Sequence, residues 1–245
     1  MVTAASIIKL GTTTSVLFVA PQLDTPWARD YQTVNLLRED AEGRLDQLLG
    51  RWRGLLTHHH WPAPLVAGGE GLRMRPQLVS VVRRYFDDWW PLDGRLEGRL
   101  AWIGVKAQHP DLNVLLDIGG GSTECVTPRD SWSIPAGALR PQTDWSWPPL
   151  SDHPPVVIGG TAGVLARLWN RPVINREHIT RVGHRRHELA NWLTPERQAL
   201  FQGGLIVLER FWDHYGWPFV RLSERGLLEG LWLTRSLGRK GPPES

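Results

Sequence analysis

Short apolar runs, separated by turns of small residues, set the pattern of the first part of the chain. Residues 6–20 are apolar on both sides of Gly11, Thr12 and Thr13, which predicts a β-hairpin because small residues suit a tight turn between two strands. Four further short apolar runs predict strands: 64–67, 113–116, 156–158 and 219–222.

Between these runs, apolar residues recur at the spacing of a helix. In residues 33–56 leucines recur at helical intervals with charged residues between them, which predicts a long amphipathic helix. Further helices are predicted at 77–89, 97–105, 185–193, 195–215 and after residue 226. Strands that alternate with helices in this way indicate an α/β protein.

The pattern of strand, turn and strand occurs twice. Residues 7–14 can be laid over residues 115–122, and each copy places a turn of tiny residues between two strands. Two such units predict two related lobes that offer backbone amides to a shared cleft, so Gly11, Thr12 and Thr13 are candidate phosphate-binding residues of the first lobe. We expect the first lobe to cover 1–112 and the second 113–231, with a C-terminal helix at about 232–245 that packs back on the first lobe.

Composition narrows the class of protein. Of 245 residues, 41% are apolar and 22% charged, as in folded globular proteins. The 28 basic residues stand against 25 acidic ones, so we expect no nucleic acid partner. No stretch is apolar and long enough to span a membrane. The single cysteine, Cys125, excludes an intramolecular disulfide and fits a reducing cytoplasm. The sequence leaves open whether the protein forms a homodimer.

The second turn of the repeat carries a candidate phosphate loop, made of Gly119, Gly120, Gly121 and Ser122. Glycines let the backbone approach an anion closely, and successive amides in such a turn form a nest for phosphate oxygens. The serine adds a hydroxyl donor. A tight hairpin that binds nothing explains this motif, taken alone, about equally well.

Two further features are compatible with anion binding. Gly160 and Thr161 open a predicted helix, where free amides and the helix dipole favour an anion, although helix capping explains them nearly as well. Arg73 follows a glycine-rich turn and would serve as a forked phosphate clamp. Taken alone, it is better explained as a surface arginine in an ion pair.

Three carboxylates are candidates for chemistry. Asp117 and Glu124 stand at the edges of the glycine loop, where they would hold a hydrated Mg²⁺ against phosphate or merely cap the turn. Glu97 lies on a predicted helix that ends shortly before this strand. A carboxylate in the cleft would orient or deprotonate an attacking water, the one group-specific task of phosphoanhydride hydrolysis.

Together these motifs resemble the exopolyphosphatase and guanosine pentaphosphate phosphohydrolase (Ppx/GppA) family, within the actin-like ATPase superfamily. The resemblance covers nearly the whole chain and rests on the order and spacing of five motifs: E-G-R-L at 97–100, D-I-G-G-G-S-T-E at 117–124, S-I-P-A-G-A-L-R at 133–140, G-G-T-A at 159–162 and S-E-R-G-L at 223–227.

The resemblance implies two ribonuclease H-like (actin-like) lobes, each a mixed sheet flanked by helices, with a phosphate-binding cleft between them. It also implies hydrolysis of terminal phosphates of inorganic polyphosphate or guanosine pentaphosphate with Mg²⁺. Glu97 matches the family's catalytic base, and Asp117 and Glu124 match its metal-associated acids. Residues 119–122 match its phosphate loop, and Arg73 matches an arginine after the same turn.

Several positions depart from the family's pattern. Lys9 stands where the family has an aspartate, and residues 12–14 are Thr-Thr-Thr in place of Ser-Asn-Ser. Val16, Ala199 and Leu228 replace a frequent arginine, an aspartate and an arginine, respectively. Exchanging a carboxylate for an ammonium removes a partner for metal or water and adds a positive charge.

These departures leave two main hypotheses. The first is an exopolyphosphatase-type hydrolase, because Glu97 and the loop at 117–124 are both retained. The second is a diverged, catalytically weak or inactive polyphosphate- or nucleotide-binding protein of the same fold. A kinase-like ATPase of the superfamily is third, and the trimmed second half argues against the adenosine pocket that it needs.

Overall fold

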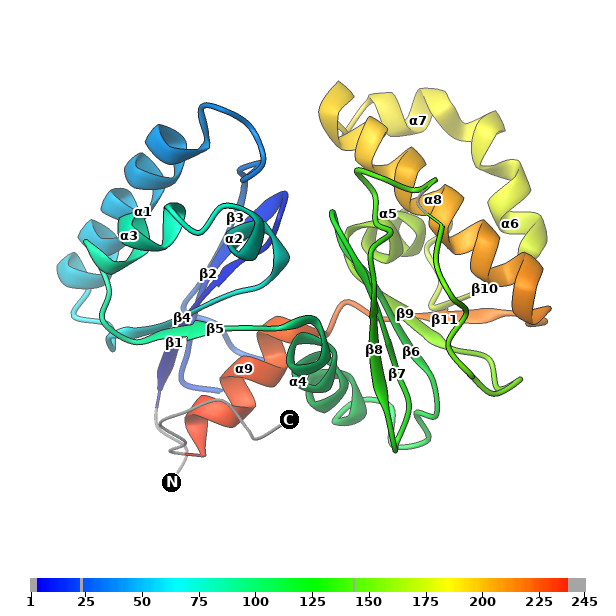
Figure 1. Ribbon diagram of the computed structural model, residues 1–245, viewed down its shortest axis with the longest axis horizontal. Helices are drawn as coiled ribbons and strands as arrows, with labels where there is room; N and C mark the ends of the chain where they lie inside the picture. The colour runs from blue at the N-terminus through cyan, green and yellow to red at the C-terminus, as the bar shows by residue number, and fades with distance from the viewer. Residues whose placement is uncertain (1–3, 23, 143, 238–245) are drawn as a thin grey trace.

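Two α/β lobes lie side by side, the first on the left of Figure 1 and the second on the right. The computed structural model describes residues 4–22, 24–142 and 144–237. Each lobe is built on one mixed sheet with helices on its faces, so the predicted fold class is confirmed. No helix within these residues combines the length and apolarity that crossing a membrane requires.

The sheet of the first lobe has the strand order β3-β2-β1-β4-β5. β1 pairs antiparallel with β2, and β2 with β3, whereas β1 with β4 and β4 with β5 are parallel. The strands are β1 (Ala5–Leu10), β2 (Thr14–Ala20), β3 (Ala28–Thr33), β4 (Pro64–Gly68) and β5 (Trp89–Pro91). The predicted hairpin at 6–20 is thus present as β1 and β2.

The sheet of the second lobe repeats this plan in the order β10-β11-β9-β6-β7-β8. Its segment β8-β7-β6-β9-β11 has the same directions as β3-β2-β1-β4-β5, and β10 adds an antiparallel edge. The strands are β6 (Leu115–Ile118), β7 (Thr123–Val126), β8 (Ser131–Ile134), β9 (Val156–Ile158), β10 (Val173–Ile174) and β11 (Val220–Leu222).

The predicted internal repeat is confirmed down to its hydrogen bonds. The Gly11 amide donates to the Thr14 carbonyl at 3.0 Å, and the Gly119 amide donates to the Ser122 carbonyl at 3.0 Å. Each turn joins the first two strands of its unit. Lys9 and Asp117 therefore occupy equivalent positions, each two residues before the turn glycine.

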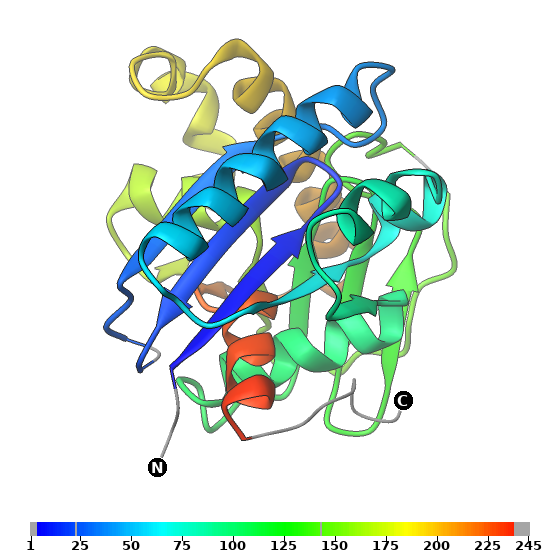
Figure 2. The same cartoon turned by 90° about the vertical axis from the view of Figure 1, so that its left-hand side faces the viewer.

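Helices cover both faces of the first sheet. α1 (Ala41–His58) crosses its outer face, as Figure 2 shows, and packs there with α3 (Leu78–Arg83). The inner face packs on α4 (Gly94–Lys106) and α9 (Leu227–Ser236), whose other contacts include Leu115 and Val156 of the second sheet. α4 and α9 therefore form an apolar layer between the two sheets. The short α2 (Glu70–Met74) follows β4.

The helices of the second lobe pack against one face of its sheet in a separate apolar core. They are α5 (Gly160–Trp169), α6 (Arg176–Thr180), α7 (Arg186–Ala190) and α8 (Pro195–Tyr215), with a 3-10 turn at Arg181–Arg185. Thr194 caps α8 by accepting from the Arg197 amide, and Pro195 occupies its first turn.

The predicted long helix at 33–56 is wrong in its first third. The chain forms β3 (Ala28–Thr33) and a turn before α1 begins at Ala41. β3 is a largely polar edge strand without a buried residue, so its sequence carries no apolar alternation. Leu36 lies in this turn and its side chain is buried. Its spacing from the leucines of α1 therefore resembled the start of a helical apolar stripe.

The predicted helix at 77–89 is also wrong in its second half. α3 ends at Arg83, and Trp89 enters β5, which pairs in parallel with β4. Pro91 ends this strand, and the pairing with distant residues decides the structure there. The predicted helix at 185–193 forms only over Arg186–Ala190.

The C-terminal helix packs on α4 and on β1 of the first sheet. It forms over Leu227–Ser236, which confirms the helix predicted after residue 226; of the range of about 232–245 assigned to it, residues 238–245 lie outside the described part of the chain. The division into lobes at 112 and 113 stays a proposal.

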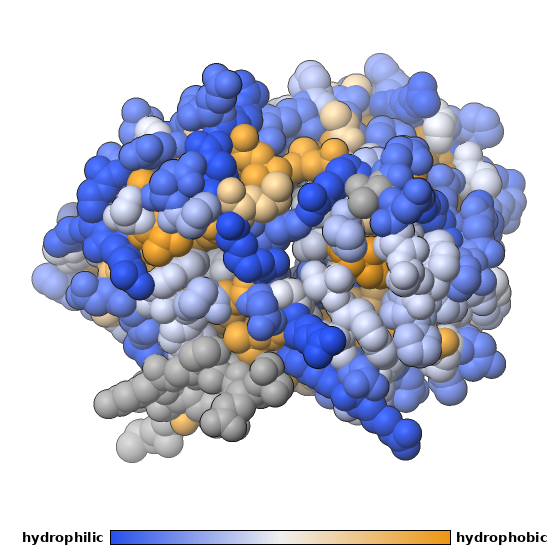
Figure 3. Space-filling view, in the orientation of Figure 1, coloured by the Kyte–Doolittle hydropathy of each residue, from blue (hydrophilic) through white to orange (hydrophobic). Residues whose placement is uncertain are grey.

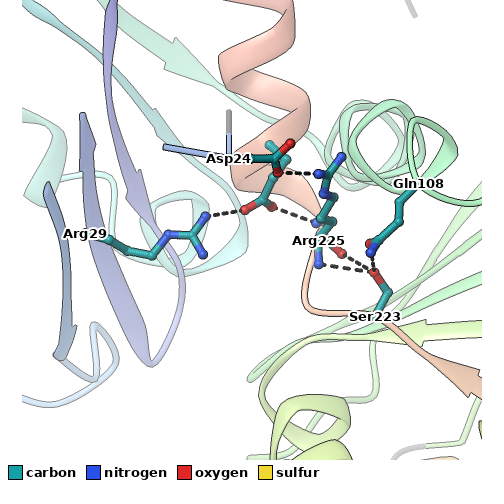
Figure 4. A network of polar contacts seen from close by, with 7 residues as sticks. Asp24, Arg29, Gln108, Ser223 and Arg225 are labelled. Carbon is teal, nitrogen blue, oxygen red and sulfur yellow. Dashed lines mark hydrogen bonds and ion pairs between the residues drawn. The ribbon is translucent and has the colours of Figure 1, made fainter. Parts of the chain in front are cut away.

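Polar contacts tie the start of α9 to the first lobe (Figure 4). Glu229, 4% exposed, accepts from Arg29 at 2.6 Å and from the Gly226 amide at 2.8 Å. Arg225 forms an ion pair with Asp24. These contacts fix the segment that leads from the second sheet back to the first.

Glycines allow α4 and α9 to touch at their backbones. A Cβ on Gly230 would lie 2.6 Å from the Leu100 carbonyl carbon, and one on Gly104 would lie 2.7 Å from the Gly230 nitrogen. Both obstacles are backbone atoms, so a rotamer change cannot relieve them. The spacing of these helices, and with it the spacing of the lobes, depends on these glycines.

We expect Gly230→Ala to lower the free energy of unfolding by about 1–3 kcal/mol, because the added methyl forces the helices apart. Gly54→Ala is the matched control: Gly54 is an exposed position in α1, and a Cβ there meets nothing within 4 Å. That change should stabilise by roughly 0.5–1 kcal/mol. Urea unfolding measures both, and a neutral Gly230→Ala would contradict the close crossing.

Candidate functional site

A pocket between the lobes takes its lining from equivalent parts of both. The first hairpin contributes Lys9 and its turn, and the second contributes the acids and glycines of the D-I-G-G-G-S-T-E motif. The predicted site residues that line it are Gly11, Thr12, Thr13, Glu97, Asp117, Gly119, Gly120, Gly121, Ser122, Glu124, Gly160 and Thr161.

The two turns meet at the floor of this cleft. A Cβ on Gly120 would lie 2.8 Å from Thr13 Cγ2 and 3.4 Å from Thr12 Cβ. Any larger residue at position 120 would push the threonine turn away. The glycine therefore serves the close approach of the lobes as well as backbone access for a ligand.

Asp117 and Glu124 are neighbours across the β6–β7 pair. Both are buried, at 6% and 2% exposure. Glu124 Oε1 accepts hydrogen bonds from the Ser122 hydroxyl at 2.8 Å and the Ser133 hydroxyl at 2.9 Å. The antiparallel pairing thus holds two carboxylates on one face of the sheet, at the edge of the glycine turn.

Glu97 reaches the same cleft from the first turn of α4. Asp93 begins this helix by accepting from the Leu96 amide at 2.8 Å, which sets the direction of the first turn. The Glu97 carboxylate lies over Gly69, where a Cβ would be 2.9 Å from its Cδ. A glycine after β4 therefore leaves the space that this side chain occupies.

Burial raises the pKa of each of the three acids. Burial raises the pKa of Glu97 to about 7, with repulsion from Asp117 and Glu70 opposed by attraction to Lys9 and Arg73. Burial also raises the pKa of Asp117, and Lys9 opposes this rise.

The pKa of Glu124 is raised well above its ordinary value by burial, with repulsion from Glu97 and Asp117 adding to the rise. The hydrogen bonds from Ser122 and Ser133 act in the opposite direction. The cleft therefore holds three acids whose pKa values are all raised above their ordinary values.

Arg73 lies apart from the other predicted site residues. Its side chain donates to the Leu92 carbonyl. Among the described residues, Arg73 is not one of those that line the pocket. Arg73 does act electrostatically on Glu97. Its proposed role as a phosphate clamp would require its side chain to leave Leu92.

The structure shows an ion pair across the cleft that the sequence gave no reason to predict. Glu70 of α2 contacts Arg140 of the second lobe, whose Nε also donates to the Gly121 carbonyl at 2.8 Å. The second Glu70 oxygen is buried and accepts no hydrogen bond from the described residues. Arg197 of α8 donates to the Thr14 hydroxyl at 3.2 Å. Both contacts join the lobes.

One wall of the pocket is apolar. Val164 of α5 and Leu193, Leu200 and Phe201 at and near the start of α8 line it beside the glycine turns. Figure 3 shows apolar atoms in the hollow between the lobes, surrounded by hydrophilic surface. The cleft therefore combines a charged floor with an apolar side.

The acids fit a Mg²⁺ ion that a substrate helps to hold. Within the described ranges, no three His, Cys, Asp or Glu side chains gather to hold a metal ion. Mg²⁺ is often bound by one or two carboxylates together with substrate phosphates and water. Asp117 and Glu124 supply two such carboxylates in the pocket, so the donor set fits an ion shared with phosphate and does not form a complete protein cage.

Comparison with known proteins gives matches in structure. No protein-family model matches the chain, and no curated protein matches its sequence. An exopolyphosphatase from Cytophaga hutchinsonii superposes with a TM-score of 0.80 at 18% identity, over 97% of this chain and 99% of that one. The Aquifex aeolicus member of the Ppx/GppA family gives 0.74 at 18% identity, over 96% and 98%. The chain has the Ppx/GppA fold.

A further structure supports this result: an exopolyphosphatase-like protein has a TM-score of 0.78 at 16% identity, over 96% of this chain and 99% of that one. The predicted resemblance to Ppx/GppA proteins is confirmed at the level of the fold. Lys9, Glu70, Arg140 and Arg197 are the polar residues of this site to which the sequence assigned no definite role. For Lys9 the departure from the family's pattern was the only signal.

The raised pKa of Glu97 predicts a pH-dependent loss of stability in metal-free buffer. Between the ordinary pKa of 4.5 and about 7, the folded protein retains a proton that the unfolded chain releases, so stability falls as pH rises through this window. Glu97→Gln removes the ionisation. We expect this variant to exceed the natural protein in stability above the window, by on the order of 1–3 kcal/mol.

Thermal unfolding in EDTA across this pH range measures the difference, which should vanish below the ordinary pKa of Glu97, 4.5. Glu42→Gln is the control, because Glu42 lies exposed in the first turn of α1. A difference that is constant with pH, or one shared by the control, would show that Glu97 does not carry this proton.

Proposed function

We propose that the protein hydrolyses terminal phosphoanhydride bonds of inorganic polyphosphate, guanosine pentaphosphate or both. The observation that carries this proposal is the meeting of Glu97, whose pKa is about 7, with two glycine-containing turns in one cleft. A carboxyl group near its pKa at neutral pH can accept a proton from water and release it again. The Ppx/GppA fold and its exopolyphosphatase neighbours support the same reaction.

Phosphate binding falls to backbone groups of both lobes. The turns at 11–14 and 119–122 and the start of α5 line the cleft together. Gly159, at φ 95°, precedes α5 and leaves the first amides of this ten-residue helix at the pocket. Amides of such turns and of a helix N-terminus stabilise the negative charge of phosphate oxygens.

Glu97 would activate the attacking water. The water oxygen forms a bond to the terminal phosphorus, the bond from that phosphorus to the bridging oxygen breaks, and the shortened chain leaves with the electron pair. The proton of the water passes to Glu97, which lies above Gly69 at the edge of the cleft. Positioning and charge stabilisation supply most of the catalysis in phosphoryl transfer.

Asp117 and Glu124 would hold Mg²⁺ against the bound phosphates. When bound, the ion supplies charge neutralisation and polarises phosphoryl oxygens. Its effect on the acids is favourable too, because the two carboxylates otherwise repel each other in a buried site. A cytoplasmic location and the absence of a nucleic acid partner remain predictions, and whether the protein forms a homodimer remains open.

Lys9 favours a second candidate function, which is binding of polyphosphate or a nucleotide without turnover. Its ammonium side chain lines the cleft beside the acids and attracts the Glu97 carboxylate. If that attraction held Glu97 away from the attacking water, the cleft would bind phosphate and release no product. Hydrolysis measurements separate the two functions.

We expect Mg²⁺-dependent orthophosphate release from long-chain polyphosphate or from guanosine pentaphosphate, lowered at least about 100-fold by Glu97→Gln, because general-base catalysis typically contributes this much or more. Glu42→Gln, an exposed change on α1, is the matched control and should leave the rate unchanged. Release that survives Glu97→Gln would refute the assignment of the base. Binding without release from either substrate would establish the second function.

A further inference from the structure

Lys9 is the unusual group of the cleft. It lies on β1 at the position that Asp117 has on β6, two residues before the turn glycine. The repeat thus places opposite charges at equivalent points of the two hairpins. Lys9 Cε approaches within 4.0 Å of the space for a Cβ on Gly11, so the side chain extends along β1 toward the first turn.

The Lys9 ammonium has no direct partner in the described part of the chain: no hydrogen bond or ion pair joins it to another residue there. The other cations around the cleft are engaged. Arg140 contacts Glu70, and Arg197 donates to Thr14. A half-buried ammonium that lines a pocket without a direct partner has its donors available for a ligand.

The surrounding charges would otherwise oppose an anionic ligand. Glu70, Glu97, Asp117 and Glu124 all line the pocket. Lys9 attracts two of them, Glu97 and Asp117, through space. A phosphate that enters this cleft therefore needs a positive charge close to it, and Lys9 is the pocket-lining cation nearest the first turn in sequence.

We propose that Lys9 is a resident cation of the phosphate site, which binds the terminal phosphate directly and allows ligand binding without a divalent metal. The inference rests on the proposed phosphate-binding cleft and concerns binding, apart from turnover. An ammonium donates charge-assisted hydrogen bonds to phosphate oxygens. It therefore takes over, on the side of the first lobe, the charge neutralisation that a metal ion otherwise provides.

The first experiment measures binding of imidodiphosphate, a diphosphate analogue with a nitrogen bridge that resists hydrolysis, by calorimetry with the full chain. We expect the natural protein to bind imidodiphosphate in EDTA, and Mg²⁺ to tighten this binding further. Lys9→Met should weaken binding in EDTA at least about tenfold, because a charge-assisted contact is lost. Mg²⁺ should restore part of this loss.

Lys106→Met is the matched control. Lys106 lies on α4, donates to the Leu112 carbonyl at 3.1 Å and is not among the pocket-lining residues, so its loss should leave binding unchanged. Thermal unfolding of each variant shows that it is folded. Equal binding by Lys9→Met and the natural protein in EDTA would overturn the proposal, as would a natural protein that binds only with Mg²⁺.

A second experiment uses the metal alone. Lys9→Asp adds a carboxylate to the pocket that Asp117 and Glu124 line, so we expect it to bind Mn²⁺ at least about tenfold more tightly than the natural protein in an electron paramagnetic resonance titration. Unchanged Mn²⁺ affinity would show that Lys9 does not stand in the place of a metal, and would overturn the proposal.

These readouts keep the two proposals separate. Imidodiphosphate binding that depends on Lys9, in a protein that releases no orthophosphate, would retain the resident cation and refute hydrolysis. Orthophosphate release that depends on Glu97, together with binding that ignores Lys9, would retain hydrolysis and refute the resident cation.

Discussion

The burial of several carboxylates in one cleft is the constraint on which the rest of the site depends. Glu97, Asp117 and Glu124 come from α4, β6 and β7 and line one pocket. Ionised groups that are buried close together raise one another's pKa unless positive charge or hydrogen bonds compensate. Lys9 and two serine hydroxyls supply that compensation. The outcome is a carboxyl group on Glu97 that titrates near neutral pH, which suits proton transfer from water.

Small residues hold this group of acids in place. Gly120 lets the glycine turn touch the threonine turn, and Gly69 leaves space for the Glu97 carboxylate. Gly104 and Gly230 bring α4 and α9 into backbone contact between the two sheets. Glu97 lies on α4 and Asp117 on β6, so the packing of this helix layer sets the separation of base and acids. A change far from the pocket, at Gly230, therefore reaches the chemistry through helix spacing.

The sequence predicted the features that repeat or that follow a local rule. The two hairpins share a turn of tiny residues, and both form the same hydrogen bond within their turns. The strand at Pro64–Gly68 and the helix around Glu97 also followed from apolar runs and helical spacing. Such features depend on neighbours in the chain, so a single sequence contains the information needed to predict them.

Features decided by distant residues escaped prediction. β3 is polar and forms because β2 offers it an edge, and β5 forms because β4 lies beside it. The pair of Glu70 and Arg140 joins residues of two lobes, and Arg73 turns to the Leu92 carbonyl. No local pattern marks such partners, since each is chosen by how the lobes come together. The placement of Lys9 beside the acids likewise required the folded cleft.

The central claim, that this cleft directs water to a terminal phosphorus, is tested most directly by following the oxygen of the attacking water. Tripolyphosphate is incubated with the full chain and Mg²⁺ in heavy-oxygen water, and the products are resolved by phosphorus NMR. The account predicts label in orthophosphate, none in pyrophosphate, and a rate that rises with pH through about 7, where Glu97 loses its proton. Label in pyrophosphate, or no orthophosphate at any pH from either tripolyphosphate or guanosine pentaphosphate, would contradict it.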